Sequence, residues 1–224
     1  METTKKSARK TTKSSASVEK IRSAYTEYLL TEGKQPASVY KFCIDLGIRE
    51  EEFYGFFGSF DAVERDIWNG FITKATTRLR GDKTFASFTS REKILSFYYT
   101  LFEELKNNRS FVLRQLGTFR KPEIIPSFLK SFKQTFDEFV DSVLNQGKSN
   151  GEIATRPYLD KVYPQLFWMH LGFLLLYWRD DDSAEFEKTD AAVEKSVNLA
   201  FDLIGKGAVD TALDFAKFLY QSKK

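Results

Sequence analysis

Few residues of this chain have side chains that commonly catalyse reactions or bind metal ions, and they are isolated from one another. The 224 residues include one histidine, His170, and one cysteine, Cys43. A Cys/His metal cluster needs several such ligands, so we expect no metal site formed by one chain. A serine–histidine–aspartate arrangement would depend on His170, which lies within a predicted apolar helix. We therefore expect neither enzymatic activity nor a cofactor.

Two motifs and the single histidine need an interpretation. Residues 146–149, QGKS, resemble the end of a phosphate-binding loop, but Ser142 stands where that pattern requires glycine, and we interpret the segment as a turn. The aspartates at 180–182 follow an apolar helix, where consecutive carboxylates typically form a solvated loop and helix cap rather than a cation site. His170 is either a core histidine with satisfied hydrogen bonds or a polar anchor for a ligand in an apolar cavity.

The elements that position these residues are all predicted to be helices, so the expected fold class is all-α. Apolar residues recur at steps of three and four from Ser17 onwards, and glycines end three short segments. Short helices separated by glycine turns and followed by a long helix to Gly81 predict a helix-turn-helix head. A capping box at 89–92 opens the next helix. Further helices are expected within 122–144, 158–178, 185–204 and 207–221.

We expect three parts in the chain: a tail of residues 1–16, a helix-turn-helix domain of residues 17–65 and a helical ligand-binding and dimerisation domain of residues 66–224. Residues 1–20 hold six cationic and two acidic side chains, a net charge of +4, against +3 for the whole chain. The tail is too poor in apolar residues to offset the entropy cost of ordering it. It either binds nucleic acid or an anionic membrane, or only aids solubility. Its cationic residues are Lys5, Lys6, Arg9, Lys10 and Lys13.

Residues 18–68 resemble the head of the TetR family of transcriptional regulators. The family's spacing of small and apolar positions is matched without a gap by Gly33, Ser38-Val39, Phe42-Cys43, Gly47-Ile48, Phe53-Tyr54, Phe57 and Ser59. A weaker likeness, over residues 151–178, is to the family's turn and the long dimerising helix that follows it. The resemblance implies an all-helical homodimer with two DNA-reading heads and, in each body, a cavity for a small-molecule effector.

The resemblance also indicates candidate contact residues. Operator DNA would be contacted by the basic tail and by Ser38, Tyr40, Lys41, Arg49 and Tyr54. The chain has 22 phenylalanines, which favours an apolar small molecule or a lipid as the ligand. The residues expected to bind it are Phe97, Leu101, Phe132, Phe136, Trp168, His170, Phe173 and Tyr177. The dimer is expected to form through helices 158–178 and 185–204.

The third helix of the head departs from the family pattern in its charge. Arg49 and the glutamates at 50–52 stand where the family usually has hydroxyl, small or basic residues, and Phe60 replaces a frequent lysine. Residues 48–61 carry a net charge of −3, which opposes binding to the phosphates of duplex DNA. The tail, or Lys41 with Arg65, would have to compensate. Alternatively, the glutamates only complement the helix dipole.

Aromatic residues follow the acidic helix and have two interpretations. Tyr54, Phe56, Phe57 and Phe60 are expected to form the small core of the head and its seam with the fourth helix, rather than a platform for stacking bases. The closing helix, 207–221, is apolar over most of its circumference. It packs on the body or across a dimer, or it rests on a membrane or covers a lipid cavity.

Two functions follow from these features. The first is a dimeric TetR-like regulator that an apolar effector controls. The second is a TetR-fold protein that has lost DNA binding and presents a lipid to a partner enzyme, similar to the lipid-binding proteins of ubiquinone biosynthesis. An adaptor dimer without a ligand is a third, lesser alternative. The single cysteine and the lack of an apolar leader segment fit a cytoplasmic protein.

Overall fold

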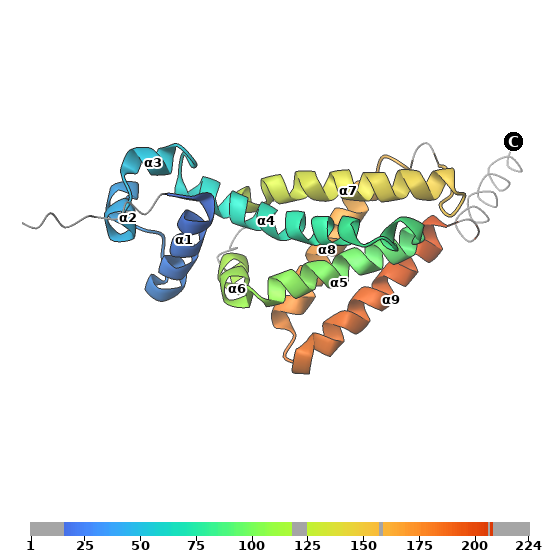
Figure 1. Ribbon diagram of the computed structural model, residues 1–224. Coiled ribbons are helices and arrows are strands. Elements are labelled where there is room, and N and C mark those ends of the chain that lie inside the picture. Colours follow the sequence, from blue (N-terminus) through green and yellow to red (C-terminus); the bar gives the residue numbers. More distant parts are fainter. Residues whose placement is uncertain (1–15, 118–124, 157–158, 206, 208–224) are drawn as a thin grey trace, which may run out of the picture. The chain divides into compact units, whose positions relative to one another are not determined.

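The computed structural model describes residues 16–117, 125–156, 159–205 and 207 (Figure 1). These residues form α-helices and short 3-10 segments without a strand, which confirms the all-α class. The chain divides into two compact units, Met1–Glu64 and Arg65–Lys224. The five cationic residues of the predicted tail lie outside the described residues, as does nearly all of the predicted closing helix.

The first unit, which we call the head, contains α1 (Val18–Glu32), α2 (Val39–Leu46), α3 (Glu50–Tyr54) and the beginning of α4 (Phe60–Gly81). The hydroxyl of Ser17 accepts a hydrogen bond from the Lys20 amide (3.1 Å), and that of Ser38 accepts one from the Lys41 amide (3.2 Å). Both serines thus cap helix N-termini, as the sequence predicts for Ser38. Gly47 ends α2 with φ of 72°, a left-handed conformation that glycine adopts without strain.

The core of the head is a cluster of aromatic rings around Phe60. The ring centroids of Tyr25, Phe42 and Phe53 lie 5.3, 5.4 and 5.6 Å from that of Phe60. The Tyr25 hydroxyl donates a hydrogen bond to Glu64 (2.6 Å). Burial, together with this carboxylate, raises the pKa of Tyr25. The family's frequent lysine position is therefore occupied here by the central residue of an apolar core.

Two residues predicted for this core lie outside it. Phe57 and Phe60 are buried as expected, but Tyr54 is 52% exposed and Phe56 is 46% exposed. The reason is the length of α3, which has only five residues and buries Phe53 alone. The chain leaves the helix at Gly55, so the periodicity that would turn Tyr54 and Phe56 inward is not continued.

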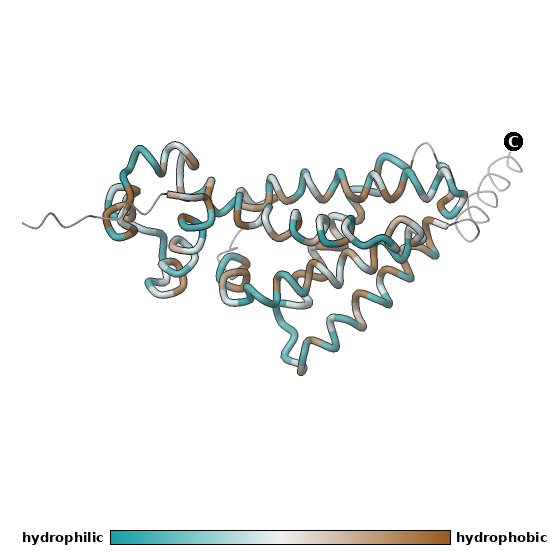
Figure 2. The backbone as a smooth tube through the Cα atoms, in the orientation of Figure 1, coloured by the Kyte–Doolittle hydropathy of each residue, from teal (hydrophilic) through white to brown (hydrophobic). Residues whose placement is uncertain are grey.

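The second unit, which we call the body, contains the rest of α4, then α5 (Ser90–Lys106), α6 (Arg109–Gly117), α7 (Lys130–Ser149), α8 (Tyr163–Asp180) and α9 (Glu187–Ile204), with 3-10 segments η1 (Phe85–Ser87), η2 (Ser127–Leu129) and η3 (Ala184–Phe186). Helix α5 packs against α7 and α9, and α8 contacts both of these helices. Hydrophobic and hydrophilic segments alternate along α7 and α9, as expected for helices that bury one face (Figure 2). None of the described helices is long and apolar enough to cross a membrane.

Two predicted boundaries in the body are wrong. QGKS, predicted as a turn, is the last turn of α7, and the chain turns only after Ser149. Gly147 is buried there against Ser90 and Ile153, so closely that an added Cβ atom would lie 2.6 Å from Ile153 Cδ1. The apolar helix predicted from residue 158 begins at Tyr163. Pro164 fits the first turn of α8 because its missing amide is not needed there.

Candidate functional site

Helices α2 and α3, joined by the turn at Gly47, form the helix-turn-helix of the head. The predicted DNA-contacting residues that the structure describes are exposed: Ser38, Tyr40, Lys41, Arg49 and Tyr54. Sequence reasoning missed Ile44, which is 60% exposed and lies four residues after Tyr40. That spacing places both side chains on one face of α2 and would have identified Ile44. This apolar and aromatic set is largely exposed, although the Tyr54 ring also meets the buried Phe53 ring edge-on, with 5.6 Å between the centroids.

The cations of the helix-turn-helix are paired with neighbouring carboxylates. Lys41 Nζ lies 3.6 Å from Asp45, and the Arg49 guanidinium lies 3.3 Å from Glu51 and 3.4 Å from Glu52. Residues 16–64 contain five lysines and arginines against nine aspartates and glutamates, a net charge of −4. The described part of the head therefore has no surplus of positive charge to bind phosphates.

One of the three glutamates has a structural role. Glu52 Oε2 accepts a hydrogen bond from the Arg49 backbone amide at 2.9 Å. This bond satisfies an amide at the start of α3, where the family usually has a hydroxyl side chain. Carboxylates in a first turn also interact favourably with the helix dipole, by about 0.3 to 1 kcal/mol each. The acidic segment thus helps to form α3 whether or not the helix meets DNA.

Seven of the eight predicted ligand-binding residues fall into two groups in the body, and His170 is half-buried. Five of them are buried where α5, α7 and α8 meet: Phe97, Leu101, Phe132, Phe136 and Trp168. Ring centroids are 5.9 Å apart for Phe97 and Phe136, and 5.7 Å apart for Phe136 and Trp168. By contrast, Phe173 and Tyr177 are exposed on α8. The structure therefore does not bring the eight residues together around one space.

His170 lies in a chain of hydrogen bonds that joins three helices. The Tyr98 hydroxyl of α5 lies 3.2 Å from His170 Nδ1, and Nε2 lies 2.7 Å from the Ser196 hydroxyl of α9. Ser196 donates its own proton to the Ala192 carbonyl, so it accepts from Nε2, and Nδ1 accepts from Tyr98. Both ring nitrogens have partners, as a satisfied core histidine requires. Burial lowers the pKa of His170 to about 4, which keeps the ring neutral.

Exposed apolar side chains follow one stripe of α8. They recur at steps of three and four residues: Leu166, Met169, Phe173 and Leu176. Helix α9, which contacts α8, exposes Leu199 and Leu203 at the same kind of spacing. Large apolar stripes of this kind on monomers mark interaction surfaces. The two helices are those predicted to form the dimer.

The three aspartates after α8 behave as a helix cap. Asp181 is buried, and its carboxylate accepts hydrogen bonds from the backbone amides of Ser183 and Thr189, both at 2.9 Å. Burial opposes ionisation, but the hydrogen bonds from Ser183 and Thr189 outweigh it and lower the pKa of Asp181. Asp180 and Asp182 are exposed and pair with neighbouring cations. Within the described residues, no group of His, Cys, Asp and Glu could hold a metal ion.

Comparisons with known proteins agree with this arrangement. Residues 93–219 match the model of the family described as "Tetracyclin repressor-like, C-terminal domain". No protein of curated function matches the chain in sequence. Several solved structures have the same fold.

The first is a protein described as a TetR-family transcriptional regulator from Syntrophomonas wolfei, with a TM-score of 0.66, 14% identity, and coverage of 86% of this chain and 97% of that one. A TetR-family regulator from Shewanella has a TM-score of 0.55 at 12% identity, covering 82% and 95%. A protein of unknown function from Rhodococcus has a TM-score of 0.56 at 9% identity, covering 88% and 100%. Since the family model spans more than half of the chain, this protein belongs to the TetR family.

Proposed function

We propose that this protein is a dimeric transcriptional regulator that binds operator DNA through its helix-turn-helix and releases it when an apolar effector binds in the body. The observation that carries this proposal is the exposed set on α2 and α3: Tyr40, Ile44 and Tyr54 are 62%, 60% and 52% exposed. In a helix-turn-helix such side chains are available to contact bases, methyl groups and phosphates. The TetR fold, and family members described as regulators, support this function.

The charge of the head requires a second source of phosphate contacts. Residues 16–64 carry −4, whereas residues 1–15 carry five cations and one glutamate, a net +4. Binding free energy on DNA comes largely from cations that displace counterions. We therefore infer that the head supplies sequence preference and that the N-terminal residues supply most of the affinity. Basic arms that follow the backbone or enter the minor groove act in this way in other proteins.

Neutralising the tail is expected to remove most of the salt dependence of DNA binding. The variant replaces Lys5, Lys6, Arg9, Lys10 and Lys13 with glutamine. Fluorescence anisotropy with the duplex upstream of the protein's own gene, between about 50 and 200 mM KCl, gives the slope of log K against log salt. Each lost phosphate contact reduces that slope by about 0.9. Preference for this duplex over a scrambled one should persist, because the head reads the bases.

This experiment tests the role of the tail and the regulator function separately. A variant that keeps the wild-type slope would show that the tail does not contact phosphates. Wild-type protein that binds both duplexes equally, or neither at low salt, would end the regulator proposal itself.

The dimer is proposed to form through the apolar stripes of α8 and α9. Leu199→Asp places a charge in this interface twice, because a two-fold axis repeats each residue. We expect the dimer to be weakened by about 2 kcal/mol, roughly thirtyfold in Kd. Leu30→Asp, at an exposed leucine of α1, is the matched control. Sedimentation velocity over a concentration series measures both; equal behaviour of the two variants would exclude Leu199 from the interface.

A second candidate is supported by the acidic head. A TetR-fold protein that binds a lipid or another apolar ligand, and no longer reads DNA, needs no positive face. The net −4 of residues 16–64 and the pairing of Lys41 and Arg49 favour it. Contact of residues 207–221 with a membrane belongs to this candidate. Native mass spectrometry of protein purified with a lipid extract tests it: a retained apolar ligand together with no sequence-preferring DNA binding would favour it over the regulator.

A further inference from the structure

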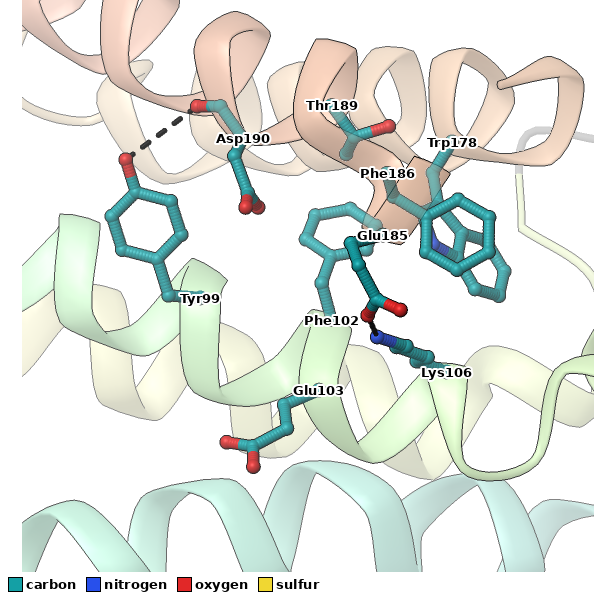
Figure 3. A pocket seen from close by; sticks show the side chains of 9 residues that line it. All are labelled: Tyr99, Phe102, Glu103, Lys106, Trp178, Glu185, Phe186, Thr189 and Asp190. Carbon is teal, nitrogen blue, oxygen red and sulfur yellow. Dashed lines mark hydrogen bonds and ion pairs between the residues drawn. The ribbon is translucent and has the colours of Figure 1, made fainter. Parts of the chain in front are cut away.

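A pocket of about 350 Å³ lies in the body between α5, the end of α8, η3 and the start of α9 (Figure 3). Its lining combines aromatic rings with ionisable side chains. None of the eight residues predicted to bind the effector lines it. The pocket is therefore a site separate from the aromatic layer between α5, α7 and α8.

Aromatic rings form two sides of this pocket. Tyr99 and Phe102 come from α5, and Trp178 and Phe186 face them from the end of α8 and from η3 (Figure 3). The Trp178 and Phe186 rings are held by the Arg109 guanidinium, which lies 4.4 Å from each ring centroid. The faces of aromatic rings attract cations. The Arg109 guanidinium between the Trp178 and Phe186 rings is an example of this cation–ring attraction inside the protein.

The acidic side chains of the pocket differ in their partners. Glu103 pairs with Arg78 at 2.7 Å, and Glu185 pairs with Lys106. The Asp190 carboxylate points into the space between α5 and η3 (Figure 3). Among the described residues it has no hydrogen bond or ion pair. Partial burial raises the pKa of Asp190, and this effect outweighs the opposite influence of the Lys106 charge on the same carboxylate.

The backbone at the pocket is strained. Glu185 and Phe186 are consecutive residues with φ of 52° and 66°, and they are the only non-glycine residues with positive φ among those the structure describes. Side chains with a Cβ atom disfavour this conformation. Such strain is concentrated at binding sites, where the surrounding contacts hold it in place. The Glu185 and Phe186 side chains, which follow from this backbone conformation, line the pocket.

We propose that this pocket binds an organic cation, whose ammonium group pairs with Asp190 and whose apolar part lies against Tyr99 and Phe102. The proposal does not depend on DNA binding or on the apolar effector. The site also stays accessible in the proposed dimer. Asp190 and Leu199 are nine residues apart on α9, which at about 3.6 residues per turn places them on opposite sides of the helix.

Isothermal titration calorimetry of the full chain with benzyltrimethylammonium tests the site, with benzyl alcohol as the uncharged aromatic probe. We expect Asp190→Asn to weaken binding of the cation about fivefold, the effect of losing one partly exposed ion pair. Asp141→Asn, at an exposed aspartate of α7, is the matched control and should leave it unchanged. Lys106→Met should tighten binding, because it removes a competing cation and frees Glu185.

Cation binding that is weakened at Asp190, unchanged at Asp141 and tightened at Lys106 supports the site. Equal binding of benzyl alcohol, equal effects of the two aspartate substitutions, or no binding of the cation by wild-type protein overturns it. Amide shifts in NMR spectra at Tyr99 and Asp190 then show whether the bound cation occupies this pocket.

Discussion

Phe53→Ala is expected to unfold the head while the body stays folded. Phe53 is fully buried, and its ring centroid lies 6.1 Å from that of Phe42 and 5.6 Å from that of Phe60. Replacing a buried phenylalanine with alanine costs about 3 to 5 kcal/mol. The described part of the head consists of three helices and the start of a fourth, so this loss is comparable to the whole stability of so small a unit.

The distribution of tryptophan makes this expectation testable. All three tryptophans, Trp68, Trp168 and Trp178, belong to the body, so their fluorescence reports its unfolding. In Phe53→Ala, we expect the head amides to lose protection from hydrogen exchange while the fluorescence transition in urea keeps its midpoint. Phe56→Ala, at an exposed neighbour, should change stability by no more than about 0.5 kcal/mol. Loss of both units together would show that the head has no separate stability.

The two ends of α2 could be predicted because they depend on local chemistry. A serine that caps an amide three residues later, and a glycine that adopts a left-handed φ, act within one turn of the chain. Ser38 and Gly47 have these roles in the structure. The core of the head was harder to predict. A helix of five residues, such as α3, is too short for its pattern to define a face, so the sequence predicts the wrong side for Tyr54 and Phe56.

In the body, tertiary contacts override local signals. The local sequence predicts a turn at Gly147, but this residue continues α7, where the packing of Ser90 and Ile153 leaves room for glycine only. The pocket shows the same limit. Tyr99 and Asp190 are 91 residues apart in sequence, and the Tyr99 hydroxyl meets the Asp190 carbonyl at 3.5 Å. Nothing in either local sequence indicates that pairing, or the positive φ of Glu185.

The net charge of the head can be counted from the sequence, whereas the contacts of the charged side chains are known only from the structure. Three glutamates in α3 are a strong signal against phosphate binding. The structure adds that Glu52 is turned back to its own helix and that Arg49 is engaged with two of the glutamates. The glutamates therefore stabilise α3 without any partner. The proposed phosphate contacts are best tested in the N-terminal tail.

The hydrogen-bond chain through His170 predicts how stability depends on pH. The neutral ring accepts from Tyr98 and donates to Ser196, so each donor in the chain has one acceptor. A second proton would have to sit on Nδ1, directed at the Tyr98 oxygen, and the buried Tyr98 hydroxyl would lose its acceptor. This hydrogen-bond chain joins α5 to α8 and α9, so its loss would weaken the packing among these three helices of the body.

When the pH is lowered from about 7 to about 4, the free energy of unfolding of the wild-type protein is expected to fall by about 3 kcal/mol more than that of the His170→Gln variant. The pKa of His170 is about 4 in the folded protein, below its ordinary value, so the unfolded chain takes up the proton first. The stabilisation is thus complete above about pH 6.5 and is lost as the pH falls towards 4. Urea unfolding across this range measures the difference, and since His170 is the only histidine, other groups cancel between the two proteins. Parallel pH profiles would mean that His170 is exposed and titrates normally in the folded state.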